Sequence, residues 1–289
     1  MATTAAPSIV KPSGPAARKR GRMSLAMTAF YAILRRDVVV TGRDFIPFLL
    51  QTLLQPLFFL FIFGTVLPSI GLARAGFGSV LLPGIVALTA FTAALQGVTL
   101  PLVLDLGFAR EIDDRLLAPL PVWFVSAEKV LFAALRGLVA GAVIFPLAAW
   151  ILGSEFAVRT DRIPMLIVIM LLTSCAGATV GMTIGTLIKP EQIGLMFALI
   201  LTPLLFTGCT YYPWSLLNNI KWFQVLTLFN PLTYAAEGMR YAMVPEQSFF
   251  GHTVAFPTLE LKWVLLGLGA TVVVFFMLGS QTFRRRVIS

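Results

Sequence analysis

The charged residues divide the sequence into long apolar stretches. Asp, Glu, Lys and Arg are all absent from seven runs: 45–73, 75–104, 137–154, 163–188, 192–220, 222–236 and 263–283. A helix needs about 20 residues, at 1.5 Å each, to cross the hydrocarbon of a membrane. Run 222–236 is too short and contains Asn230-Pro231, whereas the other six reach or approach this length. The pattern therefore predicts an all-α membrane protein with six transmembrane helices near 46–69, 78–104, 131–153, 164–188, 192–209 and 260–282.

The composition excludes an ordinary soluble enzyme. Apolar residues make up 58% of the chain and charged residues 12%, with a mean hydropathy of +0.89, whereas soluble domains are near 45–50% and 25%. One His and two Cys are too few for most metal sites or a disulfide framework. We expect no metal site, and we interpret Cys175 and Cys209, both in apolar runs, as small packed thiols.

The basic residues predict the orientation. The side that holds both termini carries fifteen Lys and Arg residues and the other side six. Because cytoplasmic loops carry the excess of Lys and Arg, we expect a multi-pass protein of the cytoplasmic membrane with both termini in the cytoplasm. The net charge of +9 is then a signal of topology and of contact with membrane lipid, and we expect no nucleic-acid partner.

The two ends of the chain are basic. Residues 1–22 carry a basic cluster and little apolar surface, so we expect a disordered cytoplasmic tail near anionic lipid. Residues 284–289 form a second basic cytoplasmic tail. In 23–44, apolar residues recur at helical spacing from Met23 to Val38. This segment is predicted to be an amphipathic helix lying in the cytoplasmic interface before the first span.

The loop between the second and third spans holds the densest charge cluster, which we assign to a short surface helix at 105–118. It is either a solvated loop helix or a docking element for a partner. The five residues that would make such a contact are Arg110, Glu111, Asp113, Asp114 and Arg115.

Small residues at four-residue spacing mark the third and fourth spans. The third contains Gly137-x-x-x-Gly141, and the fourth has glycine at 177, 181 and 185. This spacing lets helix backbones approach closely, either within one chain or between two subunits.

Polar residues inside the spans are few. Arg136 is the one charge clearly within a predicted span, five or six residues from its cytoplasmic end and so about 8 Å deep. It either snorkels to the interface, forms a structural ion pair, or lies on a translocation path. Gln55 and Gln96 are further candidates for that path, which we predict between spans one, two and five. The spans lack buried carboxylates in their middles, which argues against a proton- or sodium-coupled carrier.

Between spans five and six, segment 210–240 combines aromatic residues with Tyr212-Pro213 and Asn230-Pro231. Aromatic residues favour the membrane interface, and non-helical backbone at membrane depth must be covered by protein or water. We predict a re-entrant hairpin at the outer face. Glu237 and Arg240, three residues apart, can pair on one helical face.

At this segment the chain resembles the permeases of ABC-2 type transporters. The matching residues are Asn230, Pro231, Leu232, Tyr234 and Arg240, with the Tyr212-Pro213 turn before them. The resemblance covers nearly the whole chain, from the N-terminal interfacial helix to the sixth span. It implies that 23–41 is the family's connecting helix, that 105–118 is the coupling helix seated in an ATPase subunit, and that 45–283 is the six-helix transmembrane domain.

The resemblance also implies a function. Two permeases, identical or homologous, would work with two ATPase subunits to export a drug, lipid, polyketide or lipid-linked glycan. The sequence contains no Gly-x-x-x-x-Gly-Lys-Ser/Thr motif, so we expect ATP and magnesium to bind the partner ATPase and this chain to be no enzyme. Two alternatives stay open: an ATP-independent carrier or channel, and a membrane transferase, for which His252 and Asp113-Asp114 offer little convergent chemistry.

Overall fold

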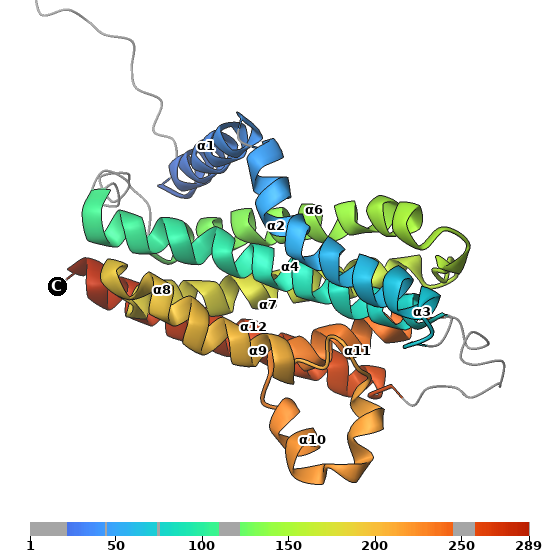
Figure 1. The fold of residues 1–289 in the computed structure, drawn as a ribbon. Helices are drawn as coiled ribbons and strands as arrows, with labels where there is room; N and C mark the ends of the chain where they lie inside the picture. Colours follow the sequence, from blue (N-terminus) through green and yellow to red (C-terminus); the bar gives the residue numbers. More distant parts are fainter. Residues whose placement is uncertain (1–21, 44, 74–75, 110–121, 245–257, 289) are drawn as a thin grey trace, which may run out of the picture.

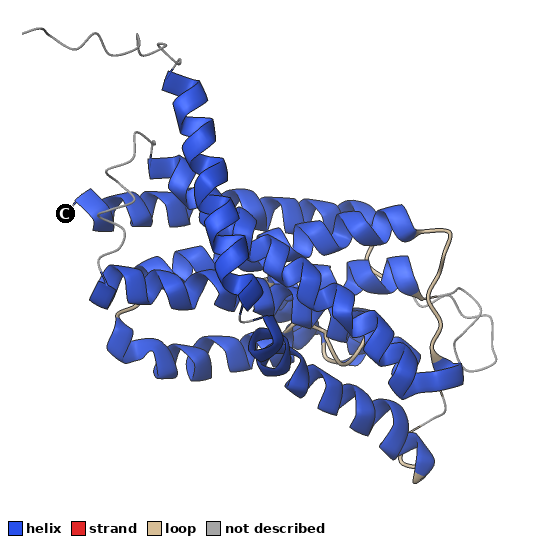
Figure 2. Cartoon of the chain, turned by 90° about the horizontal axis from the view of Figure 1, so that it is seen from above, coloured by secondary structure: helices blue, strands red, loops and turns tan. Residues whose placement is uncertain are grey.

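The computed structural model describes residues 22–43, 45–73, 76–109, 122–244 and 258–288. Within these ranges the chain forms helices joined by short loops, and no strand occurs (Figure 2). Six helical stretches are long and apolar enough to cross a membrane: Phe45–Ser69, Phe77–Gly107, Trp123–Glu155, Ile163–Leu187, Pro190–Thr207 and Leu261–Arg286. The prediction of an all-α protein with six candidate spans is confirmed.

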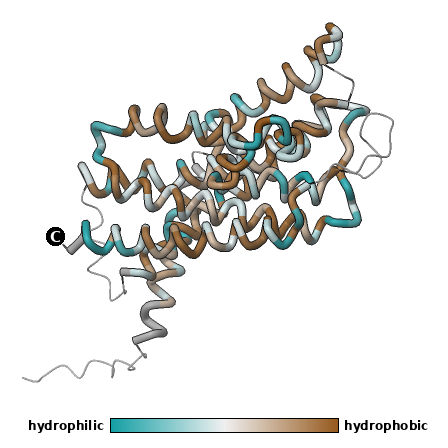
Figure 3. Tube along the Cα trace, turned by 90° about the horizontal axis from the view of Figure 1, so that it is seen from below, coloured by the Kyte–Doolittle hydropathy of each residue, from teal (hydrophilic) through white to brown (hydrophobic). Residues whose placement is uncertain are grey.

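The spans lie side by side in one bundle (Figure 1). They are α2 (Phe45–Phe61) continued by α3 (Leu67–Ser69), α4 (Phe77–Leu104), α6 (Val122–Leu152), α7 (Ile163–Leu187), α8 (Ile193–Met196) with α9 (Thr202–Thr207), and α12 (Leu261–Ile288). Hydrophilic residues gather toward the two ends of the bundle (Figure 3), as a bilayer requires.

Helix α4 is the centre of the fold. In its apolar window 89% of the residues are buried, the largest share of any span among the described residues. The glycines of α7 lie against it. A Cβ at Gly177 would stand 2.3 Å from the carbonyl oxygen of Phe91, and one at Gly181 would stand 2.3 Å from that of Leu95. The small-residue spacing of the fourth span therefore serves packing within the chain, which decides between the two alternatives left open above.

The third span packs on α4 in the same way. A Cβ at Gly137 would lie 2.4 Å from the carbonyl oxygen of Ala90. Helix α6 is longer than expected, because it begins at Val122 rather than near residue 131. Glu128 and Lys129, which precede the predicted start of the span, are buried side chains on this helix.

Spans one and five form an outer layer over this centre, which we call the loose layer. The last span, Leu261–Arg286, is equally exposed, with 11% of its apolar window buried. Only 22% of the apolar window of Phe45–Ser69 and 12% of that of Pro190–Thr207 are buried. Each contains a π-helical segment, η1 (Ile62–Val66) and η5 (Phe197–Leu201). Proline follows shortly after each, at Pro68 and Pro203. Because proline has no N–H, it leaves a preceding carbonyl without its intrahelical donor, which favours such irregular turns.

The chain ends differ from the expected segments in one respect. Helix α1 (Arg22–Arg43) covers the predicted interfacial helix, and its Phe30 packs edge-on against Phe124 at the start of α6, with ring centroids 5.9 Å apart. At the other end α12 runs to Ile288. The basic residues predicted as a separate tail from 284 are therefore part of the last helix as far as the structure describes it. The predicted tail at 1–22 lies outside the described residues except for Arg22.

Candidate functional site

The segment between spans five and six folds into three short helices, η6 (Trp214–Asn219), α10 (Lys221–Thr227) and α11 (Pro231–Met243). Helix α10 projects from the side of the bundle, whereas α11 lies against it (Figure 1). Most residues of α11 are buried, and it packs on α4, α7 and α12. The residues predicted as a hairpin thus include a helix built into the protein core.

Asn230 and Pro231 begin α11. The Asn230 side chain accepts a hydrogen bond from the Leu232 N–H at 2.9 Å, as an N-cap residue does, and Pro231 occupies the first helical position. The Asn230 amide also donates to the carbonyl of Leu204 at 2.7 Å and to the hydroxyl of Thr207 at 2.9 Å. One side chain therefore both caps α11 and ties it to the end of α9.

Tyr234 connects α11 to its two neighbours. Its hydroxyl donates to the carbonyl of Leu228 at 2.8 Å. Its ring lies over Gly267 of α12, where an added Cβ would stand 2.7 Å from ring carbons. Helix α12 therefore approaches Tyr234 at a position where only glycine fits without a shift.

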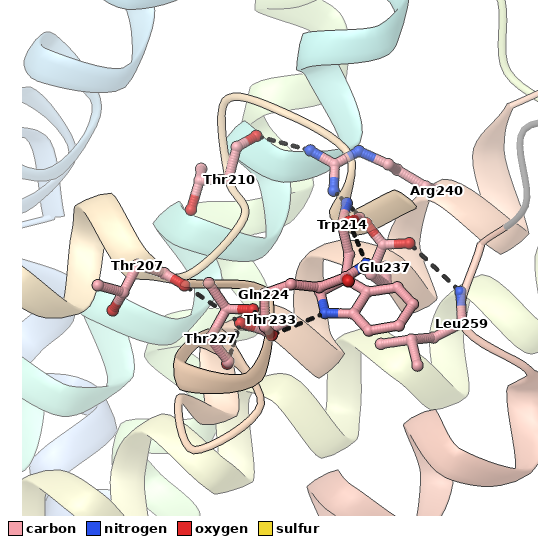
Figure 4. Close-up of polar contacts among 9 residues, drawn as sticks. All are labelled: Thr207, Thr210, Trp214, Gln224, Thr227, Thr233, Glu237, Arg240 and Leu259. Atoms are coloured by element: carbon pink, nitrogen blue, oxygen red, sulfur yellow. Dashed lines mark hydrogen bonds and ion pairs between the residues drawn. The ribbon is translucent and has the colours of Figure 1, made fainter. Parts of the chain in front are cut away.

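Glu237 and Arg240 form an ion pair inside the protein, with 0% and 3% of their side chains exposed. Arg240 Nη1 donates to Glu237 Oε1 at 2.8 Å, and its Nη2 donates to the carbonyl of Thr210 at 2.9 Å. The carboxylate accepts from the backbone N–H of Trp214 at 2.9 Å and of Leu259 at 3.4 Å (Figure 4). The pair predicted from spacing alone therefore joins three separate chain segments.

The loop bound by this pair approaches α4 closely. A Cβ at Gly84 would lie 1.8 Å from the carbonyl oxygen of Thr210. The same loop contains Cys209, whose φ of 49° is left-handed and whose side chain is fully buried. Burial raises the pKa of the Cys209 thiol to about 11, so the thiol stays protonated at neutral pH, as expected for a packed cysteine.

A second polar feature lies between spans one, two and five. A cavity of about 100 Å³ opens among α2, α4, η5 and α9. Its polar walls come from two helices, and its lining residues are Gln51, Thr52, Gln55, Pro56, Leu88, Thr92, Gln96, Leu201 and Leu205. The structure thus brings together Gln55 and Gln96, two of the three residues predicted for a translocation path, between the three spans predicted to border it. We call this cavity the glutamine pocket.

Arg136, the third predicted path residue, does not line the glutamine pocket. Its guanidinium carbon lies 4.3 Å from the centre of the Phe48 ring on α2. Because α6 begins at Val122, Arg136 is fourteen residues into its helix, about 21 Å by the helical rise. This length is measured from the start of the helix and not from a membrane boundary, so the depth of about 8 Å stays a prediction.

At the α1 end of the bundle, Lys129 of α6 pairs with Asp105 at 3.1 Å, and both side chains are largely buried. Asp105 begins η2 (Asp105–Ala109), the first part of the predicted coupling segment. A Cβ at Gly107 would overlap Pro190 of the turn between spans four and five. Sequence reasoning missed this ion pair because it placed Lys129 outside the third span.

The five charged residues predicted to contact a partner, at 110, 111 and 113–115, lie outside the described residues. The described part of the chain holds no group of three His, Cys, Asp or Glu residues suited to a metal ion.

Comparison with known proteins decides the family. The sequence profile of the ABC-2 type transporter family matches residues 28–244, from α1 to the end of α11. The chain belongs to the ABC-2 type transporter family. The match ends just after α11. The matched region of this ABC-2 type chain therefore includes the helix capped by Asn230 and the buried pair of Glu237 and Arg240.

Named relatives agree. The chain is 27% identical to the inner membrane transport permease YadH of Escherichia coli K12 over 241 residues, covering 81% of this chain and 92% of the relative. It is 26% identical to a provisionally named transport permease, ycf38, of Cyanophora paradoxa. That match covers 91% of this chain and 92% of the relative. A ycf38 protein of Porphyra purpurea is also 26% identical, with 78% and 76% covered. This chain is accordingly an ABC-2 type membrane transport permease.

Proposed function

We propose that this permease is the membrane subunit of an ATP-driven exporter that moves a hydrophobic or amphipathic solute outward across the cytoplasmic membrane. Two ATPase subunits supply the energy, and a second permease, identical or homologous, completes the path. ATP and magnesium bind the ATPase subunits. The α1 end of the bundle, which includes the end of α12, faces the cytoplasm. This proposal rests on family membership and on the glutamine pocket.

The glutamine pocket is the observation that carries the substrate class. Amide and hydroxyl groups placed in an otherwise apolar layer form hydrogen bonds with a neutral polar group, whereas the aliphatic lining favours hydrocarbon. None of its lining residues is charged. A cavity of about 100 Å³ accommodates a small polar group rather than a whole sugar chain, since one water molecule takes about 30 Å³.

The loose layer supplies the motion that alternating access needs. Spans one and five border the pocket, bury little of their surface within the chain and contain π-helical turns. Such turns often occur at functional sites. Movement of these two spans relative to α4 would widen or close the pocket, and a solute that binds one arrangement better shifts the population toward it.

The α1 end of the bundle provides the route for the driving force. The segment 105–118 is our candidate contact with the ATPase. It begins at Asp105, and the ion pair with Lys129 joins that point to α6. A displacement of this segment would therefore reach both α4 and α6.

Co-purification tests the ATPase partnership. The chain is co-expressed with the ABC ATPase encoded beside it, and the complex is isolated in detergent and assayed for ATP hydrolysis. The triple variant Glu111→Ala, Asp113→Ala and Asp114→Ala should lose most of the ATPase subunit. Glu260→Ala, which removes an exposed carboxylate before α12 at the other end of the bundle, should retain it. A chain that binds no ATPase and transports solute without ATP would favour the carrier alternative.

Transport assays test the pocket. In proteoliposomes that contain the complex, the double variant Gln55→Leu and Gln96→Leu should shift the preference from solutes with a neutral polar group toward purely apolar ones. As a matched control, Gln281→Leu changes an exposed glutamine near the end of α12, which does not line the pocket, and it should keep the wild-type preference. Unchanged solute preference in the pocket variant would show that the path lies elsewhere.

A further inference from the structure

Arg136 is a cation without an anionic protein partner in the part of the chain that the structure describes. Its guanidinium stacks on Phe48 at 4.3 Å. Its Nε is buried and has no hydrogen-bond acceptor, and the described residues form no ion pair with it. A buried N–H donor without an acceptor is costly, and an unneutralised charge in a membrane is more so. An acceptor of opposite charge from outside the chain, bound at the Nη groups, would remove the cost of the unneutralised charge.

The position of Phe48 gives the level of Arg136 in the membrane. Phe48 is the fourth residue of α2, so it lies within the first turn of the first span. Arg136 lies over its ring and is therefore at the same level. Counting along α6 agrees, because Leu152 at the opposite end is sixteen residues from Arg136, about 24 Å away along a hydrocarbon layer about 30 Å thick. Arg136 thus lies near the boundary between hydrocarbon and headgroups, on the α1 side.

The surface of α6 beside Arg136 faces the outside of the chain. On α6 its neighbours Leu135 and Val139 are each 40% exposed. On the inner side Phe48 packs against Ala93 and Ala140, which are buried. The ring holds one face of the guanidinium, and Nε is enclosed by the chain, so the two Nη groups are the donors that an external ligand would reach.

We propose that Arg136, held on α6 by the Phe48 ring of α2, binds the phosphate of an anionic glycerophospholipid in the leaflet on the α1 side. Phosphate is the abundant acceptor at this depth, and the planar guanidinium fork binds it through two parallel hydrogen bonds. A lipid with net charge −1 neutralises the single cation. A zwitterionic lipid also carries an ammonium group. Among the described residues, no carboxylate lies beside Arg136 to pair with that ammonium group.

This site is separate from the glutamine pocket and does not depend on ATP. It gives the interfacial region around α1 and α2 a lipid as a structural partner, and it accounts for an arginine in a span without assigning it to the solute path. The proposal therefore stands or falls independently of the proposed function.

The test measures lipid selectivity on the full-length chain. Wild type, Arg136→Gln, Arg136→Lys and Lys221→Gln are purified in a neutral detergent and titrated with phosphatidylglycerol or phosphatidylcholine of matched acyl chains. Native mass spectrometry gives the bound fraction, and thermal unfolding gives the stabilisation by each lipid. Lys221→Gln removes an exposed charge at the start of α10 and controls for net charge.

We expect wild type and Lys221→Gln to prefer phosphatidylglycerol, and Arg136→Gln to lose that preference by roughly tenfold, the effect of one charge-assisted hydrogen-bonded contact. Arg136→Lys should keep part of the preference for phosphatidylglycerol, because lysine retains the positive charge but lacks the planar guanidinium that forms two parallel hydrogen bonds. Equal selectivity of Arg136→Gln and wild type for the two lipids, with both proteins folded, would overturn the proposal. So would a loss of selectivity of the same size in Lys221→Gln.

Discussion

The seam between α4 and α7 and the layer formed by α2 and α9 are all built from apolar helices, yet they differ in how closely their backbones approach. At the seam, glycines at 177 and 181 lie against backbone carbonyls of α4. In the outer layer large apolar side chains such as Leu54 and Leu199 are exposed, at 57% and 65%, and the polar cavity lies beside them. Close packing thus joins α4 to α7, whereas α2 and α9 bury little of their surface within the chain.

The largest effect should come from filling the seam. Gly181→Leu places a side chain where even a Cβ would stand 2.3 Å from the carbonyl oxygen of Leu95, so α7 must move away from α4. We expect a loss above about 4 kcal/mol or no folded protein, because a rigid backbone cannot yield. Fluorescence-detected size exclusion after heating measures it. The control Gly194→Leu in α8 has open space at its Cβ, and equal damage by both variants would contradict the comparison.

The next effect concerns the buried ion pair on α11. Arg240→Gln removes the cation and leaves Glu237 buried with a negative charge. We expect a loss of about 3 kcal/mol, typical of removing one partner of a buried pair. Lys262→Gln, which removes the cation of an exposed pair with Glu260, should cost less than about 1 kcal/mol. Chemical unfolding in detergent compares the two, and similar losses would mean that the pair contributes no more than a surface contact.

A smaller effect is expected in the loose layer. The double variant Gln55→Leu and Gln96→Leu should change thermal stability by less than about 1 kcal/mol, because it alters the wall of an open cavity rather than a packed contact. A large destabilisation would show that the glutamines hold spans one and two together, and the two regions would then differ less than their burial implies.

The smallest effect concerns Cys209. With the thiol pKa raised to about 11 by burial, few molecules carry a thiolate at pH 7.5, and the thiolate is the reactive form. In a Cys175→Ala background, maleimide labelling should be slow at pH 7.5 and faster as pH rises toward 11. Ser69→Cys, at an exposed position in the outer layer, combined with Cys209→Ala, should label quickly, and equal rates would contradict the burial.

The sequence was sufficient for the six spans and for the pairing of Glu237 with Arg240, because charge-free length and helical spacing are local properties. It also indicated that Gln55 and Gln96 belong together. It did not predict the start of α6, because the charges at 128 and 129 were taken to mark an interface. Those charges are buried by contacts with distant segments, such as the pair between Lys129 and Asp105, and a search for charge-free runs cannot detect a charge neutralised by a residue 24 positions away.

The burial of α4 has a consequence for biogenesis. The spans that contain α2 and α4 have the same mean hydropathy, although 22% of one window and 89% of the other are buried. Insertion into the bilayer responds to hydropathy, so the machinery that inserts nascent chains would treat this peripheral helix and the most central one alike. Their different destinations are decided afterwards, when α7 leaves the ribosome and its glycine-bearing surface displaces lipid from α4.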